Sequence, residues 1–592
     1  MFKFTNKTTN IIAGILLLTC FLVCILSIRN MSLTMDEQAH IPSGYSYLRY
    51  QDYRLNPEHP PLAKDLSAIP LLFMDLKFPT EHTCWTDDLN GQWTCGKQFI
   101  FESGNNSEQM IFWSRVPMIL SLILLGWFIF FWTRKLVGNK PALLALLLFS
   151  FSPTMIAHGR LVTTDIAAAF GALLASYFWV NFLKKPNFKN IFIAGLALGI
   201  ALCLKFSLIL LLPSLGITAI IYAIVKSKGG KAKTKEVFRY IGLSALVGII
   251  AVIFVIWPVY QSHTWNYSAE RQLSDTAGIL TPGSNFANNI AIWLSDKPII
   301  RPVTHYALGL LMATQRVAGG NTVYFMGEVS RNAWPQYFPI MYLLKAPLSF
   351  HLLSILALAL WLVSFKKKKG LKKPKAKMSN WFKGHLAEFS LLAFFAIYWF
   401  TSIIGNLNIG VRHVIPAFPI VYILISIGLF KFIGAIKTKK IRIGLWALMG
   451  VLLVWYVVSS LLAFPLYISY YNELAGGSEN GYKYAVDSNY DWGQDLLRLR
   501  DFVEEKGIEE ISVFYFGGDD VKRILGDKLK MSWIHREEEL NHGWIAISAT
   551  LLQEGRAQAV PGFNQDTTFF NWLNDYEPAG RAGYSIFIYN LE

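Results

Sequence analysis

Acidic side chains follow directly on the first long apolar segment of this sequence. The run Met35-Asp36-Glu37-Gln38-Ala39-His40 begins a few residues after the apolar stretch Ile11 to Ile28. A carboxylate at that point lies at a membrane surface and can take a proton from a hydroxyl group. It can equally cap a helix over Ile41 to Tyr50, because aspartate is common at helix starts. Asp36 and Glu37 are therefore candidate catalytic residues with a structural alternative.

A second polar run, Asn56-Pro57-Glu58-His59-Pro60-Pro61-Leu62-Ala63-Lys64, lies further along the same loop. Glu58 and His59 could bind a divalent cation, but two adjacent ligands do not make a metal site. We favour a ligand-binding role for Glu58 or His59 and a helix-start packing role for the prolines. The apolar segment Leu66 to Phe73 follows and is too short to span a bilayer, which is typical of a helix lying in the interface.

Cationic residues next to apolar segments are candidates for contacts with a phosphate group. They are Arg160, in Gly159-Arg160-Leu161-Val162-Thr163-Thr164-Asp165, then Lys205 between two apolar stretches, and Arg412-His413 before Val414-Ile415-Pro416. Arg160 could instead pair with Asp165, and Lys205 or Arg412 could extend to the interface as anchors. Ionisable residues at membrane depth favour a functional role.

Composition places these residues in a membrane protein. Of the 592 residues 53% are hydrophobic and only 16% are charged, and many separate apolar stretches are long enough to span a bilayer. We expect about eleven spans. They are residues 11–28, 111–133, 141–157, 162–182, 190–204, 206–225, 240–260, 338–364, 386–404, 414–435 and 443–464.

The net charge of +16 is concentrated in short clusters between the spans, which indicates cytoplasmic loops rather than a nucleic-acid partner. One membrane topology places every basic cluster on the same side of the membrane as the N-terminus. The clusters are Arg134/Lys135, Lys184/Lys185, Lys226 to Arg239, Lys366 to Lys377 and Lys437 to Arg442. Residues 29–110, 261–337 and the tail from about 465 then face outside, and any chemistry is expected there.

Cysteine usage fits this arrangement. Cys20, Cys24 and Cys203 lie in apolar segments and are expected to be buried and structural. Cys84 and Cys95 lie in the first outer loop, where an oxidising compartment would allow them to pair; the sequence leaves the pairing open.

The tail, residues 465–592, has the composition of a small soluble α/β domain beside the membrane part, residues 1–464. We expect a helix over Asp491 to Lys506 and strands over Ile511 to Phe516, Trp544 to Ser548 and Tyr584 to Tyr589. Asp487, Asp491 and Asp495 are spaced by four residues, so the last two would share one helix face. This domain is expected to recognise an acceptor or support the site rather than catalyse.

The polar motifs, taken in order, resemble those of protein O-mannosyltransferases and their bacterial relatives, the lipid-carrier-dependent glycosyltransferases of the GT-C class. The matching features are the Asp36-Glu37 pair, the His59-Pro60-Pro61-Leu62-Ala63-Lys64 run, Arg160 with Asp165, and two longer stretches. These stretches are Gly327-Glu328-Val329-Ser330-Arg331 through Lys345-Ala346-Pro347, and Asp487-Ser488-Asn489-Tyr490-Asp491-Trp492-Gly493-Gln494-Asp495-Leu496. Arg412 also resembles the arginine that opens a late span in lipid A aminoarabinose transferases.

The resemblance implies a GT-C bundle of about 11 transmembrane helices with a C-terminal soluble α/β domain, in the inner (plasma) membrane. It implies transfer of one sugar, mannose or a related one, with inversion from a polyprenyl-phosphate carrier to a protein, lipid or glycan acceptor outside. Catalysis would fall to Asp36 or Glu37. The donor-binding candidates are Glu58, His59, Lys64, Arg160, Asp165, Lys205, Arg412 and His413.

Cofactors and rival functions are less constrained. The resemblance implies no metal requirement, and a divalent cation at Glu58 and His59 stays an open alternative. An oligosaccharyltransferase-like enzyme is disfavoured because the sequence has no WWD motif. A secondary transporter is disfavoured because no inverted repeat is evident. A non-catalytic membrane scaffold is the remaining alternative, and no nucleic-acid partner is expected.

Overall fold

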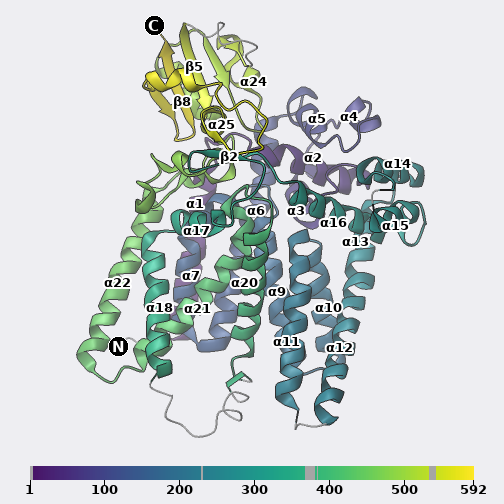
Figure 1. Cartoon of the computed structure of the whole chain (residues 1–592), viewed down its shortest axis with the longest axis vertical. Helices are drawn as coiled ribbons and strands as arrows, with labels where there is room; N and C mark the ends of the chain where they lie inside the picture. Colours follow the sequence, from purple (N-terminus) through teal and green to yellow (C-terminus); the bar gives the residue numbers. More distant parts are fainter. Residues whose placement is uncertain are drawn as a thin grey trace.

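The computed structural model describes residues 5–227, 231–283, 285–366, 381–382, 384–532 and 542–591. A bundle of long helices forms the lower part of the molecule, and a small sheet built from the C-terminal residues lies above one end of the bundle (Figure 1). Short helices of the outer loops lie between these two parts (Figure 1).

The bundle follows from the apolar stretches of the sequence. Within the described residues, eight helices are long and apolar enough to cross a membrane, or up to ten if each of two bent pairs is one span. The shorter apolar helix α10 also lies in the bundle. The helices are α1 (Asn6–Ser27), α6 (Ser107–Val137), α7 (Asn139–Ser150), α8 (Pro153–Gly159), α9 (Asp165–Lys184), α10 (Phe188–Leu202), α11 (Leu211–Lys226), α12 (Lys231–Ala251), α13 (Trp257–His263), α17 (Tyr337–Lys345), α18 (Leu348–Lys366), α20 (Leu386–Ile404), α21 (Phe418–Gly434) and α22 (Lys439–Leu462).

Two expected spans are bent rather than straight. The pair α7 and α8 bends by 62°, and the pair α17 and α18 bends by 107°. Pro153 opens α8, and the Ser152 hydroxyl caps it by accepting from Met155 N at 3.3 Å. Proline at a first helical position removes no needed hydrogen bond, so it favours a new helix start over continuation of the old helix. The second bend contains Pro347, between α17 and α18.

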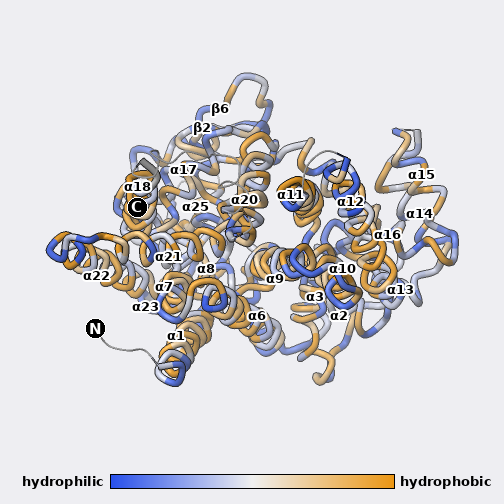
Figure 2. Tube along the Cα trace, turned by 90° about the horizontal axis from the view of Figure 1, so that it is seen from below, coloured by the Kyte–Doolittle hydropathy of each residue, from blue (hydrophilic) through white to orange (hydrophobic). Residues whose placement is uncertain are grey.

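Helices at the edge of the bundle expose apolar faces. Only 22% of the apolar window of α1 and 28% of that of α22 is buried inside the protein. Figure 2 shows these two helices at the periphery, with hydrophobic residues along them. Such faces suit contact with lipid chains rather than water.

The end of α11 and the start of α12, which both carry lysine, lie at the end of the bundle away from the C-terminal sheet (Figure 1). Arg134 and Lys135 end α6, Lys184 ends α9 and Lys226 ends α11. Residues 367–377 of the lysine-rich loop lie outside the described residues. The end-to-end charge difference therefore agrees with the expected topology, while the compartment that each end faces stays a prediction.

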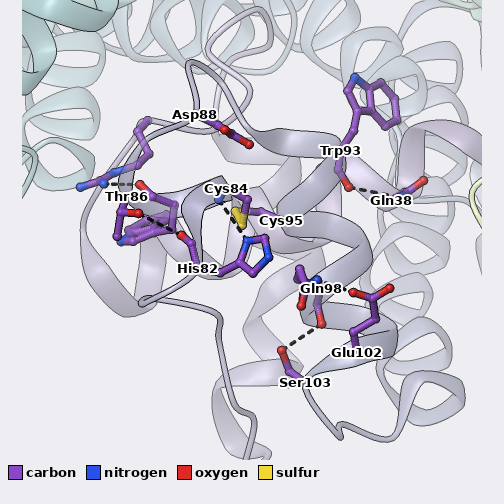
Figure 3. Close-up of a disulfide and its surroundings, with 12 residues drawn as sticks. Gln38, His82, Cys84, Thr86, Asp88, Trp93, Cys95, Gln98, Glu102 and Ser103 are labelled. Atoms are coloured by element: carbon purple, nitrogen blue, oxygen red, sulfur yellow. Dashed lines mark hydrogen bonds between the residues drawn. A yellow bond between two sulfur atoms is a disulfide. The ribbon is translucent and has the colours of Figure 1, made fainter.

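The first outer loop is a compact helical layer fastened by a disulfide. Cys84 and Cys95 are joined, and His82 Nδ1 accepts from Cys84 N at 3.1 Å beside them (Figure 3). The remaining cysteines of the chain are buried and free, as expected. The layer contains α2 (Met35–Tyr50), α3 (Leu62–Ala68), η1 (Ile69–Phe73), α4 (Thr83–Thr86), α5 (Gln92–Lys97) and η2 (Gln98–Glu102).

The second outer loop forms three helices and a hairpin. Its elements are α14 (Ala269–Leu280), α15 (Phe286–Leu294), α16 (Arg301–Gly319), β1 (Val323–Phe325) and β2 (Glu328–Ser330). Strand β2 also pairs in parallel with β6 (Gln558–Ala559) of the tail. The hairpin thus joins the second outer loop to the C-terminal part.

The tail contains a five-stranded mixed sheet in the order β4-β3-β5-β8-β7. The three expected strands are present as β3 (Ile511–Phe514), β5 (Gly543–Ser548) and β8 (Ile586–Leu591), with β4 (Leu529–Met531) and β7 (Gly580–Ala582) added at the edges. Helices α23 (Leu496–Glu505), α24 (Val521–Leu525) and α25 (Ala549–Glu554) accompany the sheet.

The helix expected from Asp491 is wrong in its first turn, because α23 begins at Leu496. Asp487, Asp491 and Asp495 all precede it, in a loop that includes η9 (Asp487–Asn489). Gly493 has φ +89°, and a Cβ there would lie 2.4 Å from Gly517 Cα. A residue in the left-handed region that is packed this closely cannot continue a helix. The spacing of four residues between the aspartates therefore does not place them on one helix face.

Candidate functional site

Asp36 and Arg412 form an ion pair between the first outer loop and a late span. Arg412 Nη1 donates to Asp36 Oδ2 at 2.6 Å, and the two side chains are 10% and 22% exposed. Asp36 lies in the first turn of α2, and Arg412 lies in η5 (Val411–Ala417), directly before α21. The pair therefore brings together two residues that are far apart in the sequence and were both expected at the site.

The tail holds the Arg412 guanidinium from two further sides. Arg412 Nε donates to Ser488 Oγ at 3.1 Å, and the guanidinium lies 4.3 Å from the Trp492 ring centroid. Ser488 Oγ in turn donates to Ile409 O at 2.6 Å. A planar guanidinium with one edge bonded and one face stacked has a fixed orientation, which suits recognition of an oxyanion.

Asp165 and Lys205 form a second ion pair beside the first. Lys205 Nζ contacts Asp165 Oδ1, and Asp165 Oδ2 faces Arg412 Nη1 at 4.0 Å. Asp165 opens α9, and Lys205 occupies the extended break between α10 and η3 (Phe206–Leu210). Two cations and two carboxylates, Asp36 and Asp165, thus meet near the outer ends of α9, α10 and α21.

Histidines complete this group. The His413 Nε2 atom is buried and has no hydrogen-bond partner among the described residues, so it is available to a ligand. His59 contacts His40 edge to face with ring centroids 5.2 Å apart. Burial, with His40, Lys64, Lys205 and Arg412 nearby, holds the pKa of His59 well below its ordinary value. His59 is therefore neutral at physiological pH.

Glu37 lies apart from this group, in the protein interior. It is 0% exposed and receives two bonds from Arg115, Nε to Oε1 at 2.9 Å and Nη2 to Oε2 at 2.6 Å. It also accepts from Thr34 N at 2.9 Å as the third residue of a capping box, and from Val162 N at 3.0 Å. Burial alone would raise the pKa of Glu37, but the Arg115 charge and these bonds lower it. Thr34, not Asp36, caps α2, which leaves the Asp36 carboxylate for other contacts.

Arg160 is also engaged in the interior. Its Nη1 donates to Ser27 O at 2.9 Å and Pro465 O at 3.1 Å, and its guanidinium lies 5.5 Å from the Tyr467 ring centroid. These contacts join the end of α1 to the chain that follows α22. The expected pairing of Arg160 with Asp165 is replaced by the pair of Asp165 with Lys205.

Lys64 and Glu58 hold the loop between α2 and α3. Lys64 Nζ donates to Tyr47 Oη at 2.8 Å and to the main-chain oxygens of Asn56 and His59, both at 2.9 Å. Glu58 accepts from the Asn90 and Gln92 side chains at 3.0 and 2.9 Å. His59 reaches the ion-pair group, whereas these contacts turn Lys64 and Glu58 toward the loop.

The tail loop supplies residues whose role the sequence did not reveal. Ser488 and Trp492 contact Arg412, and Trp492 O accepts from Met35 N at 3.1 Å next to Asp36. Asp487, held by Thr550 Oγ1 through its N–H at 3.1 Å, interacts electrostatically with Arg412 and Asp36. Burial raises the pKa of Asp487 to about 6 despite Arg412. These residues belong to a motif that is visible in the sequence, but the sequence does not show that the motif contacts Arg412.

Gly410 makes the close approach of the tail to η5 possible. Its φ is +142°, and a Cβ there would lie 2.1 Å from Ser488 Oγ. The Asn489 side chain accepts from Val411 N at 2.9 Å at the same contact. Only glycine fits this backbone without displacing Ser488 from Arg412.

A metal site is not evident in the described part of the chain, where no group of three or more His, Cys, Asp or Glu residues could hold an ion. The group instead offers two carboxylates and two cations, with His59 and His413 as further polar candidates. A carboxylate can accept a hydroxyl proton, and cations can stabilise a phosphate leaving group.

Comparison with known proteins relates this arrangement to sugar transfer. Residues 100–257 match the family model described as dolichyl-phosphate-mannose-protein mannosyltransferase. No curated protein matches the chain at a significant level. The Saccharomyces cerevisiae protein O-mannosyltransferase Pmt1–Pmt2 complex, solved with its sugar donor, is similar at TM-score 0.54 and 11% identity, over 78% of this chain and 90% of that one.

Two further solved structures are less similar. ArnT from Cupriavidus metallidurans, bound to undecaprenyl phosphate, has TM-score 0.44 and 11% identity over 98% of both chains. The Archaeoglobus fulgidus oligosaccharyltransferase, in its apo form, has TM-score 0.47 and 11% identity, over 97% of this chain and 73% of that one. Residues 100–257 are thus similar to a mannosyltransferase family, and most of the chain has a fold similar to that of a protein O-mannosyltransferase.

Proposed function

We propose that this membrane protein transfers a single sugar, mannose or a related one, from a polyprenyl-phosphate carrier to a hydroxyl group at the outer face of the plasma membrane. The observation that carries this proposal is the contact of Asp36 with Arg412 beside the pair of Asp165 with Lys205. There a carboxylate lies beside two cations. The match of residues 100–257 to a dolichyl-phosphate-mannose-protein mannosyltransferase family supports the lipid-linked donor.

In this mechanism Asp36 takes the proton of the acceptor hydroxyl as its oxygen attacks the anomeric carbon. The new carbon–oxygen bond forms on the face opposite the phosphate, so the configuration inverts. The electron pair of the broken bond leaves with the phosphate oxygen, which is stable as an anion and needs cations rather than a proton donor. Arg412 and Lys205 supply that stabilisation, and Asp165 holds Lys205 in place.

The ion pair also sets an order of events. Without donor, Arg412 bonds to the Asp36 carboxylate and occupies an oxygen that would otherwise accept the hydroxyl proton. A donor phosphate that binds Arg412 competes with Asp36 for the same guanidinium edge. Donor binding therefore releases Asp36 to act on the acceptor, and we expect the donor to bind first.

The remaining candidates take supporting roles in this proposal. The rings of His59 and His413 bind donor hydroxyls or phosphate oxygens by hydrogen bonds. Glu58 and Lys64 fix the loop that carries His59. Arg160 fixes the end of α1 relative to the tail and does not contact the donor.

A donor screen tests the proposal directly. Purified protein in lipid vesicles would be given labelled polyprenyl-phosphate mannose, glucose and aminoarabinose, and mass spectrometry would follow release of free polyprenyl phosphate. We expect release from one of these donors and none from an Asp36→Asn variant. A folded wild-type protein that releases carrier phosphate from none of them would support the scaffold alternative.

A further inference from the structure

A separate cavity of about 300 Å³ lies between the β1–β2 hairpin and the tail. Both outer regions contribute to its wall, the second outer loop through Thr322 and Val329 and the tail through the rest. The tail residues are Phe514, Leu551, Glu554, Gly555, Phe563, Gln565, Asp566, Thr567, Phe569 and Phe570. It is not formed by the residues of the ion-pair group.

Helix α25 connects this cavity to the reaction centre. At its start, Thr550 N donates to Asp491 Oδ2 at 2.8 Å, and Thr550 Oγ1 accepts from Asp487 N at 3.1 Å. At its end, Glu554 lines the cavity and interacts electrostatically with Asp487 and Asp491. Asp487 in turn interacts with Arg412 and Asp36. A chain of contacts thus joins the cavity wall to Arg412, through Thr550, Asp487 and the adjacent Ser488.

The two regions differ in their cations. The reaction centre holds Arg412 and Lys205, whereas the described lining of the cavity includes no lysine, arginine or histidine. A phosphate group placed in the cavity would be buried without a cation to compensate its charge, which is unfavourable. The cavity therefore suits an uncharged group better than the donor phosphate.

The walls of the cavity are mostly apolar. Four phenylalanines, Leu551 and Val329 line it, and the polar residues at its rim are already engaged. The Gln565 side chain accepts from Thr322 Oγ1 at 3.4 Å, and Asp566 Oδ1 accepts from Thr568 N at 2.8 Å. Few free partners remain for the many hydroxyls of a sugar, so an apolar side chain fits this wall better than a glycan.

We propose that this cavity binds the acceptor, and that the acceptor is a polypeptide with an uncharged apolar residue close to its serine or threonine hydroxyl. The inference rests on the proposed function and specifies its acceptor class. An apolar side chain between the phenylalanines would leave the neighbouring hydroxyl residue on the side of α25, whose Thr550 bonds to the loop that contacts Arg412.

Glu554 suits such an acceptor. Burial, together with Asp487 and Asp491, raises the pKa of Glu554 to about 8. Its carboxyl group is then mostly protonated at neutral pH and can donate a hydrogen bond to a peptide carbonyl. A negatively charged neighbour in the acceptor would lack any comparable partner in the described lining.

The test uses full-length protein in vesicles with its active donor. Four acceptors are compared: hexapeptides with a central serine flanked by leucine or by glutamate, a neutral trisaccharide, and a phosphorylated glycolipid. We expect turnover of the leucine peptide with kcat/KM at least tenfold above that of the glutamate peptide. Preference for the glycolipid or the trisaccharide would overturn the inference.

Two variants test whether the cavity itself determines the preference for the leucine peptide. Phe569→Ala shortens a half-buried wall residue and should raise the KM for the leucine peptide at least fivefold, with unchanged KM for the donor. Tyr576→Ala removes a 47% exposed ring from the same domain and is the matched control. Equal peptide KM values in the two variants would overturn the inference while leaving the proposed function intact. Absence of wild-type turnover with every donor would overturn both.

Discussion

At the scale of residues, two adjacent carboxylates have different environments. Asp36 is partly exposed and bonded to Arg412, whereas Glu37 is enclosed with Arg115 and caps the turn that carries Asp36. The sequence identified the pair but could not distinguish the two, because the partners Arg115 and Arg412 lie far along the chain. The same limit applied to Arg160, whose interior contacts come from the ends of two other helices.

Glu37→Gln should therefore act on stability. The change leaves Arg115, 1% exposed, without its counterion, and breaking a buried pair costs about 3 kcal/mol or more. We expect a lower Tm in detergent, with turnover per folded molecule close to that of the wild type. A stable Glu37→Gln protein that has lost turnover would instead assign the base to Glu37.

The Asp487 carboxyl predicts a pH effect on donor binding. Its pKa of about 6, raised by burial, means that it ionises between about pH 5 and 7. Ionisation adds a negative charge near Arg412, while the phosphodiester of the donor keeps its charge over this range. We expect the donor KM to rise as pH increases through 6, and to stay level in Asp487→Asn. A wild-type KM that does not change over this interval would contradict the assignment.

At the scale of elements, apolar segments were predictable and the tail loop was not. The spans follow from long apolar stretches, and the strands β3, β5 and β8 from their β-branched and aromatic residues. The loop around Asp487 depends on Gly410 and Gly493, which permit close contacts with distant segments. These contacts, rather than the local sequence pattern, determine the conformation of the loop. This part of the site could therefore not be predicted from the sequence.

Gly410→Ala tests whether the loop positions Arg412. An added Cβ 2.1 Å from Ser488 Oγ must displace the serine, and with it the bond from Arg412 Nε. We expect donor KM to rise and turnover to fall. Gly450→Ala, where the added Cβ meets nothing within 4 Å, is the matched control and should behave like the wild type. Equal kinetics of the two variants would show that the tail does not position Arg412.

At the scale of the whole molecule, basic residues and the candidate site lie at opposite ends of the helical bundle. The end of α11 and the start of α12, which both carry lysine, lie at the end of the bundle opposite the tail sheet (Figure 1). The positive-inside rule then predicts that the ion-pair group faces outside. This orientation stays a prediction from the lysine and arginine counts.

Single introduced cysteines test this topology in intact cells. We expect Tyr576→Cys in the tail to react with an impermeant thiol reagent and Lys437→Cys, between α21 and α22, to react only after lysis. Labelling of Lys437→Cys in intact cells would require the opposite orientation. Both positions are exposed, so accessibility within the fold does not limit the reaction.

The central claim is that Arg412 is shared between Asp36 and the donor phosphate. Parallel measurement of donor Kd and single-turnover rate in wild type and Asp36→Asn tests it most directly. Loss of the base should slow transfer by about 10² to 10⁴, while loss of the competing carboxylate should tighten donor binding. An Asp36→Asn protein that is folded, binds donor no more tightly and transfers at a near-normal rate would contradict the account.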